Sequence, residues 1–149
     1  MAMPELYFED VKVGQEIPPV TRKPTAIQEF MFGAIVWNRH RIHYDKDWAR
    51  QEGYPDVVIN AYTHGALLCQ LIHQWAGDFG WLQKLTFQNR RPAFLGDTLV
   101  AKGTARSTFH AEGKHAVECE VWVEKEGGEV LVPGSAVVLL PSREAPPPT

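Results

Sequence analysis

The sequence has few cysteines, no long apolar run and no strong excess of charge of either sign. Its two cysteines, Cys69 and Cys119, are isolated and lack the spacing of a metal site, so we expect two reduced thiols in the protein core. No apolar run approaches the roughly 20 residues that cross a bilayer. The amino terminus lacks a basic start followed by an apolar stretch, so we expect a cytoplasmic protein without a membrane partner.

The charge balance argues against one further class of protein. The 149 residues carry a formal net charge of −3 and a pI near 6.1, without the basic excess of a nucleic-acid-binding protein. Any site for an anion must therefore be local. A chain of this length should bury about 68–70% of its unfolded surface. We expect one domain over residues 1–149, with a core at about 6–140 and a proline-rich tail at 141–149 that is disordered or lies on the surface.

The polar segment at residues 37–45 holds the most chemically useful side chains. It reads Trp-Asn-Arg-His-Arg-Ile-His-Tyr-Asp and lies between two apolar stretches. The unperturbed pKa of histidine is close to physiological pH, so a sheltered histidine with polar neighbours is suited to proton transfer. The alternative is a solvated basic turn in which Arg39 and Arg41 simply face water.

Two helices are predicted on either side of this segment. Residues 25–28, Thr-Ala-Ile-Gln, have the form of a capping box, and the apolar side chains after Thr25 recur at helical spacing to give one apolar face. They are Ile27, Phe30, Met31 and Ala34. A longer helix, about Ala61–Ala76, is apolar on more than one side and should be buried, with Gly77 as its stop. Gly65 within it favours a close approach by a sheet or a ligand.

Strands fill the rest of the chain. Alternating patterns predict strands at residues 84–89, 98–109, 116–124 and 129–140, with a hairpin turn at 111–114 and a bulge or sheet edge at Pro133-Gly134. One strand face carries Val117, Cys119, Val121 and Val123. Residues 6–20 are extended, and Pro18-Pro19 confine any strand there to an edge. Antiparallel strands without intervening helices predict an α+β fold and exclude a doubly wound parallel sheet.

Three segments resemble the MaoC-like, or hydratase 2, family of hot-dog proteins. The site loop of that family has the form Gly-Asp-x-Asn-Pro-Ile-His, and residues 37–43 are similar to it. The matching positions are Trp37, Asn38, His40, Arg41 and His43. Residues 53–61 resemble the glycine-rich lead into the family's long helix, and residues 94–99 resemble its turn into a late strand. The resemblance implies a hot-dog fold, an antiparallel sheet wrapped around one long central helix, and a dimer formed edge to edge.

The resemblance also implies a reaction, the reversible addition of water to a 2-enoyl-CoA by a hydro-lyase. His43 matches the catalytic histidine, and Asn38 stands where the family has an acid, so His43 must be the base. Some hydratases of the superfamily look similar in carrying Asn-x-His-x-Ile-His-Tyr-Asp. His40 is expected to relay the proton or orient His43, and Asp45 is a candidate orienting carboxylate. No metal is expected at His40-x-x-His43, because no further ligand has suitable spacing.

The start of the long helix is the expected binding site for the thioester. No acidic residue lies in its first turn, so the amides of residues 60–63 remain available to an oxyanion. The resemblance implies that the amide of Ala61 binds the thioester carbonyl, although Asn60 is equally interpretable as a cap alone. Arg90 and Arg91 are candidate partners for the phosphates of coenzyme A, or edge-strand arginines that deter aggregation. No cofactor is expected beyond coenzyme A as part of the substrate.

Two other functions remain open. Asn38 in place of the acid favours a catalytically silent hot-dog subunit that binds acyl-CoA or scaffolds an active partner. A thioesterase is disfavoured, because the helix at 61–76 carries no Asp or Glu. Residues 60–77 also look like small hydratase subunits that act on steroid side-chain enoyl-CoA esters beside a second MaoC-like chain. That resemblance implies a bulky acyl group and a heteromer as the alternative to a homodimer.

Overall fold

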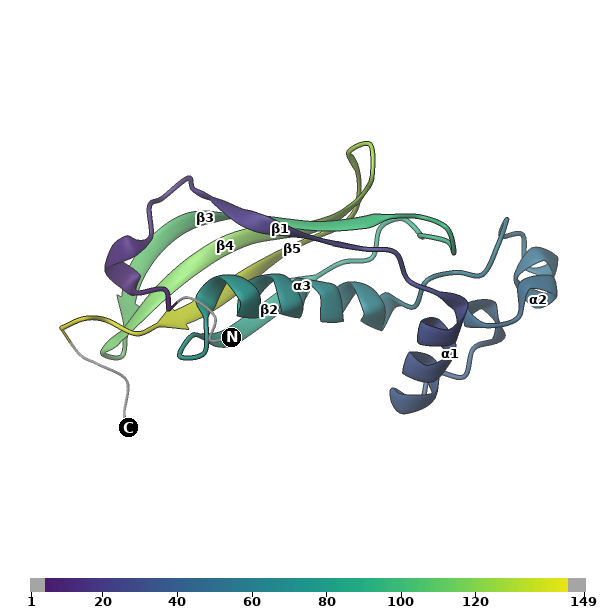
Figure 1. The fold of residues 1–149 in the computed structure, drawn as a ribbon, viewed down its shortest axis with the longest axis horizontal. Coiled ribbons are helices and arrows are strands. Elements are labelled where there is room, and N and C mark those ends of the chain that lie inside the picture. The colour runs from purple at the N-terminus through teal and green to yellow at the C-terminus, as the bar shows by residue number, and fades with distance from the viewer. Residues whose placement is uncertain (1–4, 145–149) are drawn as a thin grey trace.

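A computed structural model describes residues 5–144, with the side chain of Ala111 left out. One antiparallel sheet of five strands, in the order β1-β3-β4-β5-β2, lies against one long helix (Figure 1). The strands are β1 (Glu16–Arg22), β2 (Trp81–Phe87), β3 (Leu99–Ala111), β4 (Lys114–Lys125) and β5 (Glu129–Leu140). The helices are α1 (Ala26–Ile35), α2 (Lys46–Gln51) and α3 (Ala61–Ala76), with short 3-10 turns η1 (Phe8–Asp10) and η2 (Arg41–His43). The α+β hot-dog arrangement is confirmed.

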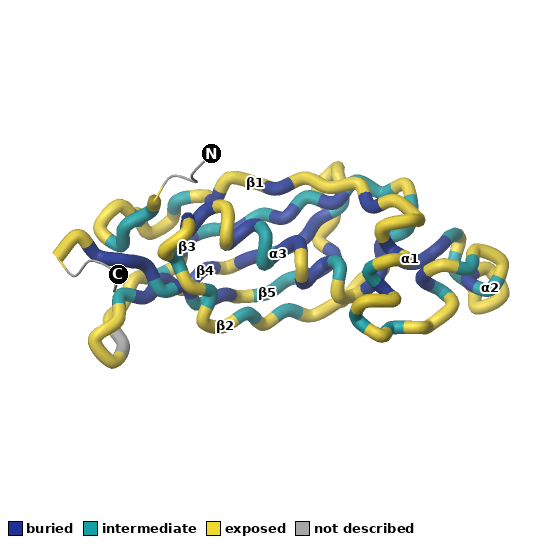
Figure 2. Tube along the Cα trace, turned by 60° about the horizontal axis from the view of Figure 1, so that its bottom comes forward, coloured by how far each residue is buried: buried dark blue, intermediate teal, exposed yellow. Residues whose placement is uncertain are grey.

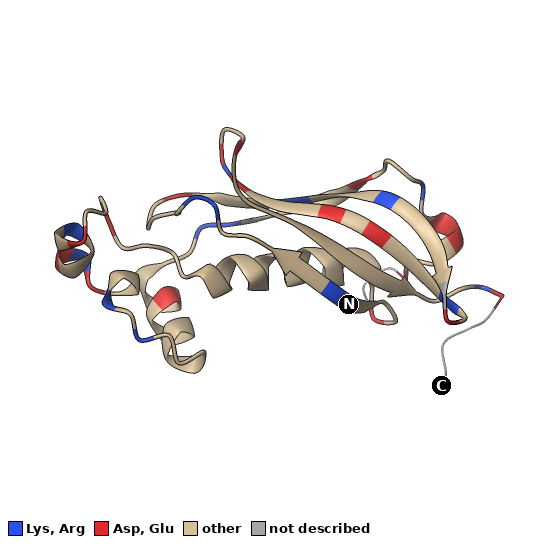
Figure 3. Cartoon of the chain, turned by 180° about the vertical axis from the view of Figure 1, so that it is seen from behind, with Lys and Arg blue, Asp and Glu red and all other residues tan. Residues whose placement is uncertain are grey.

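Helix α3 has the bounds that the sequence predicts. Asn60 caps it by accepting a hydrogen bond from the amide of Tyr62 at 3.1 Å, and Gly77, with φ of 76°, ends it. The helix carries no Lys, Arg, Asp or Glu along its whole length (Figure 3). Its apolar side chains join the sheet in one hydrophobic core; they are Leu67, Leu68, Leu71, Ile72 and Trp75. The helix is therefore buried only on the side that faces the sheet, while Tyr62, Ala66 and His73 are exposed, and its packing holds its start in place for the site.

The sheet agrees with the sequence in its centre and differs at one strand. Val117, Cys119, Val121 and Val123 on β4 are fully buried on the face toward α3, and burial raises the pKa of the Cys119 thiol to about 12. The strand predicted at 84–89 begins three residues earlier, at Trp81, and ends at Phe87. Gln88 then leaves the strand pattern, although its amide still donates to the carbonyl of Pro133 at 3.0 Å.

Pro133 does not mark an edge, because β5 lies between β4 and β2. The bulge that was the other expectation is found beside it: Val123 pairs with Val132 and Glu124 with Val130, which leaves Leu131 as the extra residue. The edge strand β1 has an irregular register between Ile17 and Val20, where the two prolines interrupt the ladder as expected.

At Gly65, α3 approaches the sheet closely. A Cβ atom at this position would lie 2.7 Å from Cζ of Phe87 on β2. The expected close approach is therefore confirmed, and its partner is an aromatic ring of the sheet. This contact fixes the first turns of α3 against β2.

Helix α1 begins at the predicted cap, with Thr25 and Gln28 in a reciprocal capping box. Its apolar face is largely exposed, however: Ile27, Phe30, Met31 and Ile35 are all exposed, although the Phe30 ring meets the ring of Tyr44 edge-on. Figure 2 shows α1 and α2 beyond one end of the sheet, with much of α1 exposed. The side of α1 that turns inward carries Glu29 and Gly33 instead.

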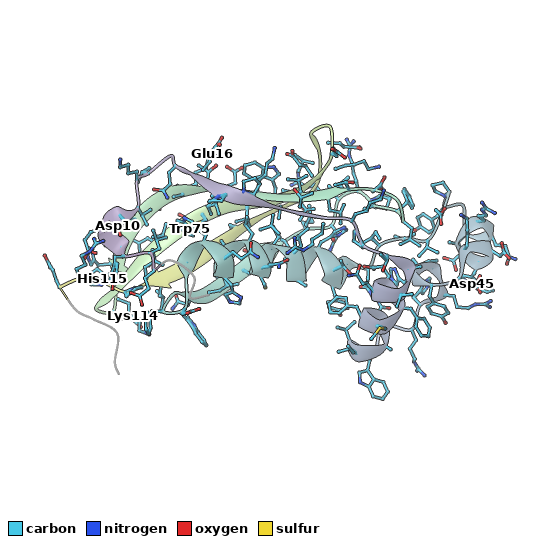
Figure 4. All side chains as sticks on the ribbon, in the orientation of Figure 1. Asp10, Glu16, Asp45, Trp75, Lys114 and His115 are labelled. Atoms are coloured by element: carbon cyan, nitrogen blue, oxygen red, sulfur yellow. The ribbon has the colours of Figure 1, made fainter. Side chains whose placement is uncertain are left out.

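The start of the carboxy-terminal segment packs against η1 at the other end of the molecule. Pro141 accepts a hydrogen bond from the amide of Phe8 at 2.9 Å, Ser142 bonds to Glu9 and is buried, and Arg143 pairs with Asp10. The expectation of a surface or disordered tail is therefore wrong for Pro141 and Ser142, and residues 145–149 lie outside the described part. Figure 4 shows Asp10 and His115 at this end and Asp45 at the other, beside α2.

No helix within residues 5–144 is both long and apolar enough to cross a membrane.

Candidate functional site

The polar segment after α1 turns sharply and places His43 beside the lead into α3. Trp37 has a φ of 58°, and the next residue, Asn38, donates its amide to the carbonyl of Gly33 at 2.9 Å. His43 is buried, with 9% exposed, and its Nδ1 lies 2.8 Å from the carbonyl of Val58. A carbonyl only accepts hydrogen bonds, so Nδ1 must carry the hydrogen. The neutral ring therefore presents the lone pair of Nε2, as a general base requires.

At the start of α3, one backbone amide is left without a protein partner. The amide of Asn60 donates to Oε2 of Glu29 at 2.8 Å, that of Tyr62 donates to the Asn60 side chain, and that of Thr63 donates to the Asn60 carbonyl. Among the contacts of the described residues, the amide of Ala61 has no acceptor. The expectation that all four amides are available is wrong for three of them, and the remaining donor is the one that the resemblance singled out.

A cavity of about 210 Å³ brings several of the expected site residues together. Its lining includes His43, Ala61, His64, Asn89, Arg90 and Arg91. His43 and Ala61, the first residue of α3, therefore line one cavity within a single chain. Both arginines are exposed at its rim; Arg91 pairs with Glu129 at 2.6 Å, and Arg90 donates to the side chain of Gln88 at 3.2 Å.

His43 also lines a second cavity, of about 320 Å³, with Asn38, Gly33, Trp37 and Glu29. The Asn38 side chain donates to Oδ1 of Asn60 at 3.2 Å. The amide at the family's acid position therefore ties the loop to the cap of α3. A side-chain amide does not ionise near neutral pH, so Asn38 can position its neighbours but cannot transfer a proton.

The other two candidate residues of the loop, His40 and Asp45, line neither of these cavities. His40 is exposed, and its ring centroid is 6.2 Å from that of His43. Asp45 does not orient His43: its carboxylate caps α2 through the amide of Trp48 at 3.0 Å and pairs with Arg41. Both contacts hold the pKa of the Asp45 carboxyl below its usual range. The interpretation of Asp45 as the orienting group is therefore wrong, because the carbonyl of Val58 has that place.

Glu29 is the residue that sequence reasoning missed. Its side chain is 2% exposed; besides the Asn60 amide, it accepts a hydrogen bond from the hydroxyl of Thr63 at 2.9 Å. Burial raises the pKa of the Glu29 carboxyl, and the hydrogen bonds from the Asn60 amide and the Thr63 hydroxyl oppose that rise. The available signal was the i,i+4 pair with Gly33, which puts a carboxyl group and a glycine on one helix face and lets that face approach another element closely.

His64 is a second buried polar group near the site. Its Nδ1 lies 2.9 Å from Oδ1 of Asn89, so that nitrogen donates, and within residues 5–144 its Nε2 has no partner. Burial lowers the pKa of His64, which keeps the ring neutral. His64 is therefore a buried, hydrogen-bonded histidine, whereas His73 on the same helix is exposed. No group of three or more potential metal ligands is found in the described residues.

A family model described as hydroxyacyl-thioester dehydratase type 2 matches residues 10–95, more than half of the chain. The chain belongs to this family. The matched range contains α1, the polar loop and α3, so it covers His43, Ala61 and the cavity between them. The MaoC-like hot-dog family implied by the sequence is confirmed.

Two relatives and one solved structure are similar to this chain. Over 68 residues, 41% of this chain, it is 40% identical to the mesaconyl-C(4)-CoA hydratase of Chloroflexus aurantiacus, of which it spans only 23%. Over 141 residues, 93% of this chain, it is 25% identical to the 3-hydroxybutyryl-CoA dehydratase of Methylorubrum extorquens, of which it spans 87%. The structure of R-hydratase PhaJ1 of Pseudomonas aeruginosa is 22% identical in sequence and superposes with a TM-score of 0.84. The match covers 95% of this chain and 88% of the PhaJ1 chain.

Relatives of this family member are thus named as hydratases and dehydratases, which are hydro-lyases, and the expected class of enzyme is confirmed. The names of the family model and of these relatives also support hydration or dehydration of acyl thioesters as the general reaction. The matched structure shows the fold.

Proposed function

We propose that this protein is an enoyl-CoA hydratase and 3-hydroxyacyl-CoA dehydratase, with His43 as the base and the Ala61 amide as the oxyanion donor. The observation that carries the proposal is that both line one cavity, with the His43 tautomer set by the Val58 carbonyl. Preorganised amide donors of this kind contribute about 2.7–4 kcal/mol each to the stabilisation of a transition state.

The proposed hydration uses these two groups together. The thioester oxygen accepts a hydrogen bond from the Ala61 amide, which withdraws electrons from the double bond. Nε2 of His43 takes a proton from water as the water oxygen bonds to C3, and the electron pair of the double bond moves toward the thioester oxygen. A proton from solvent then adds to C2 as the enolate collapses, and protonated His43 returns its proton to solvent. Dehydration is the same sequence in reverse. The proposed steps use no metal, and coenzyme A enters as part of the substrate.

Arg90 and Arg91 support coenzyme A as the carrier. They lie at the rim of the same cavity as His43, and guanidinium groups match the geometry of phosphate oxygens. The ion pair of Arg91 with Glu129 is exposed, and exposed pairs contribute about 0–1 kcal/mol, so a phosphate can replace it.

The test is turnover of crotonyl-CoA, followed by loss of the absorbance of the conjugated thioester. The wild type should hydrate it, and His43→Ala should lower kcat by about 10²–10⁴-fold, the contribution of a general base. Release of free thiol, measured in parallel, would indicate a thioesterase instead. His73→Ala, an exposed histidine on α3 outside the cavity, is the matched control.

The alternative is a catalytically silent subunit that binds acyl-CoA or scaffolds an active partner. Asn38 favours it, because the amide at the acid position cannot transfer a proton. Binding of acyl-CoA without turnover at any enoyl chain length would establish that alternative and contradict the proposed activity.

The acyl group is proposed to be bulky, such as a steroid side chain. A third cavity of about 340 Å³ supports this, because Phe32, Leu67 and Leu99 give it an apolar wall. Glu29 borders both this cavity and the 320 Å³ cavity that His43 also lines. Crotonyl-CoA, a long-chain enoyl-CoA, a branched cyclic enoyl-CoA and an enoyl-CoA with a free terminal carboxylate should be compared by kcat/KM. A preference for crotonyl-CoA would contradict the bulky acyl group without affecting the proposed reaction.

We propose that the chain works as a homodimer. The exposed apolar side of α1 supports an assembly, and Trp37 just after it is 82% exposed. Sedimentation of the wild type and of a Phe30→Glu variant should show a dimer and a weakened dimer. A monomer that becomes stable only beside a second MaoC-like chain would indicate the heteromer instead.

A further inference from the structure

Helix α1 buries a carboxyl group and exposes its apolar side chains, the reverse of the usual arrangement. Glu29 is almost fully buried, whereas Ile27 is 72% exposed and its neighbour Phe30 is 58% exposed. An ionised carboxylate is costly to bury unless it is paired and hydrogen-bonded. No lysine or arginine lies within salt-bridge distance of Glu29 among the described residues. The position of this carboxyl group therefore needs an explanation beyond packing.

The carboxyl group of Glu29 lies at the start of α3, where the proposed oxyanion donor is. Its two oxygens accept hydrogen bonds from the Asn60 amide at 2.8 Å and from the Thr63 hydroxyl at 2.9 Å. Asn60 immediately precedes Ala61 in the chain. Each carboxyl oxygen has a second position for a hydrogen-bond partner, so the group can hold a proton and keep both contacts.

Glu29 also borders the same cavity as His43. The two residues line the 320 Å³ cavity together with Asn38. This cavity therefore contains a base and an acid, although Asn38 stands at the position where the loop of the resembling family has its acid. The acid comes from α1, nine residues earlier in the chain.

We propose that Glu29 is the second catalytic residue of this site, the carboxyl group that donates a proton to C2 of the enoyl thioester during hydration. This proposal rests on the proposed hydratase function. His43 takes one proton from water, the water oxygen bonds to C3, and the enolate carbon takes the proton of Glu29. The product has gained one hydrogen and one hydroxyl group. The protonated His43 and the ionised Glu29 then exchange a proton through solvent, which restores the starting state.

Dehydration uses the same groups with reversed roles. The Glu29 carboxylate removes the proton from C2, and protonated His43 gives its proton to the leaving hydroxyl group. A raised pKa suits a carboxyl group that must be protonated in one direction and ionised in the other.

The experiment compares hydration of crotonyl-CoA by wild type, Glu29→Gln and Glu29→Asp across pH. Glu29→Gln keeps the size of the side chain and removes the transferable proton; its one oxygen can still accept from the Asn60 amide, and its NH2 can donate to the Thr63 hydroxyl. It should lower kcat by about 10²–10⁴-fold, with part of the loss recovered in Glu29→Asp. Wild-type kcat should fall as the pH rises through the pKa of Glu29, and this fall should be absent in Glu29→Gln. Glu16→Gln, an exposed glutamate on β1 (Figure 4), is the matched control.

A purely structural role predicts a different pattern. If Glu29 only holds the start of α3, then Thr63→Val, which removes one of its hydrogen bonds, should lower kcat as much as Glu29→Gln does, and neither variant should change the pH profile. That pattern would overturn the proposal, as would a Glu29→Gln kcat within about threefold of wild type. In both cases the hydratase function stands. A wild type without turnover would instead overturn both proposals.

Discussion

Gly65→Ala should destabilise the protein, although alanine is the better helix former. In an open helix interior, replacing glycine with alanine stabilises by about 0.8–1.0 kcal/mol. Here the new Cβ would lie 2.7 Å from Cζ and 3.1 Å from Cε1 of Phe87. Overpacking of this kind costs about 1–3 kcal/mol. The net effect should therefore be a loss of about 0–2 kcal/mol in the free energy of unfolding.

Phe87 is the last residue of β2, and its backbone pairs with Gly134 on β5. This pairing holds the backbone of Phe87 in place, so the ring itself has to turn or tilt to make room for the new Cβ. In a Phe87→Leu background the space opens, and Gly65→Ala should then stabilise by about 1 kcal/mol.

Urea unfolding of the four proteins in this cycle measures the effect. The sign of the Gly65→Ala change should reverse between the Phe87 and Leu backgrounds, which corresponds to a coupling energy of about 1–3 kcal/mol. A Gly65→Ala protein that is more stable than wild type by about 1 kcal/mol would refute the reasoning.

Three further predictions follow from the site and its surroundings. Burial raises the pKa of Glu29, so between its ordinary pKa and the raised one the folded chain binds more protons than the unfolded chain. The free energy of unfolding should therefore fall as the pH rises through this window. Thermal melts of Glu29→Gln should show a smaller fall. Asp45→Ala should lose a helix cap worth about 1 kcal/mol in urea unfolding yet keep its kcat, since Asp45 does not touch His43; a large loss of kcat would contradict this. Arg90→Ala and Arg91→Ala should raise KM for crotonyl-CoA by up to about tenfold, mostly at low salt, and should leave KM for crotonyl-pantetheine unchanged; equal effects on both substrates would exclude phosphate binding.

Local signals predicted the regular elements well. The sequence correctly predicted three local features: the capping box at Thr25, the bounds of α3 and the hairpin at 111–114. Each depends on residues close together in the chain. The start of β2 was misplaced by three residues, since Trp81 and its neighbours alternate too weakly to mark a strand end. The packing of Pro141 and Ser142 on η1 could not be predicted, because their partners Phe8 and Glu9 lie more than 130 residues away in the chain.

The site shows the same division. His43, Asn38 and Ala61 were identified through the resemblance, and the structure places His43 and Ala61 in one cavity. Glu29 was missed because the apolar spacing of α1 indicated a buried stripe on the other side of that helix. The contacts that turn Glu29 inward come from Asn60 and from Thr63, 34 residues later, and no pattern within α1 reveals them.

The central claim is that the free amide of Ala61 and the Nε2 lone pair of His43 act on one substrate. Ala61→Pro tests it most directly, because proline deletes that amide and little else. Ala61 is the first residue of α3, where proline is well accepted, and Asn60 before it has φ of −63° and ψ of 136°, which suits a residue preceding proline.

The measurement is kcat for hydration of crotonyl-CoA by wild type and Ala61→Pro, with thermal melts of both. A folded Ala61→Pro protein with kcat lower by about 10²–10³-fold is the predicted result, which is the effect of removing one oxyanion donor. A folded Ala61→Pro protein with the kcat of the wild type would contradict the account, because the thioester oxygen would then bind elsewhere.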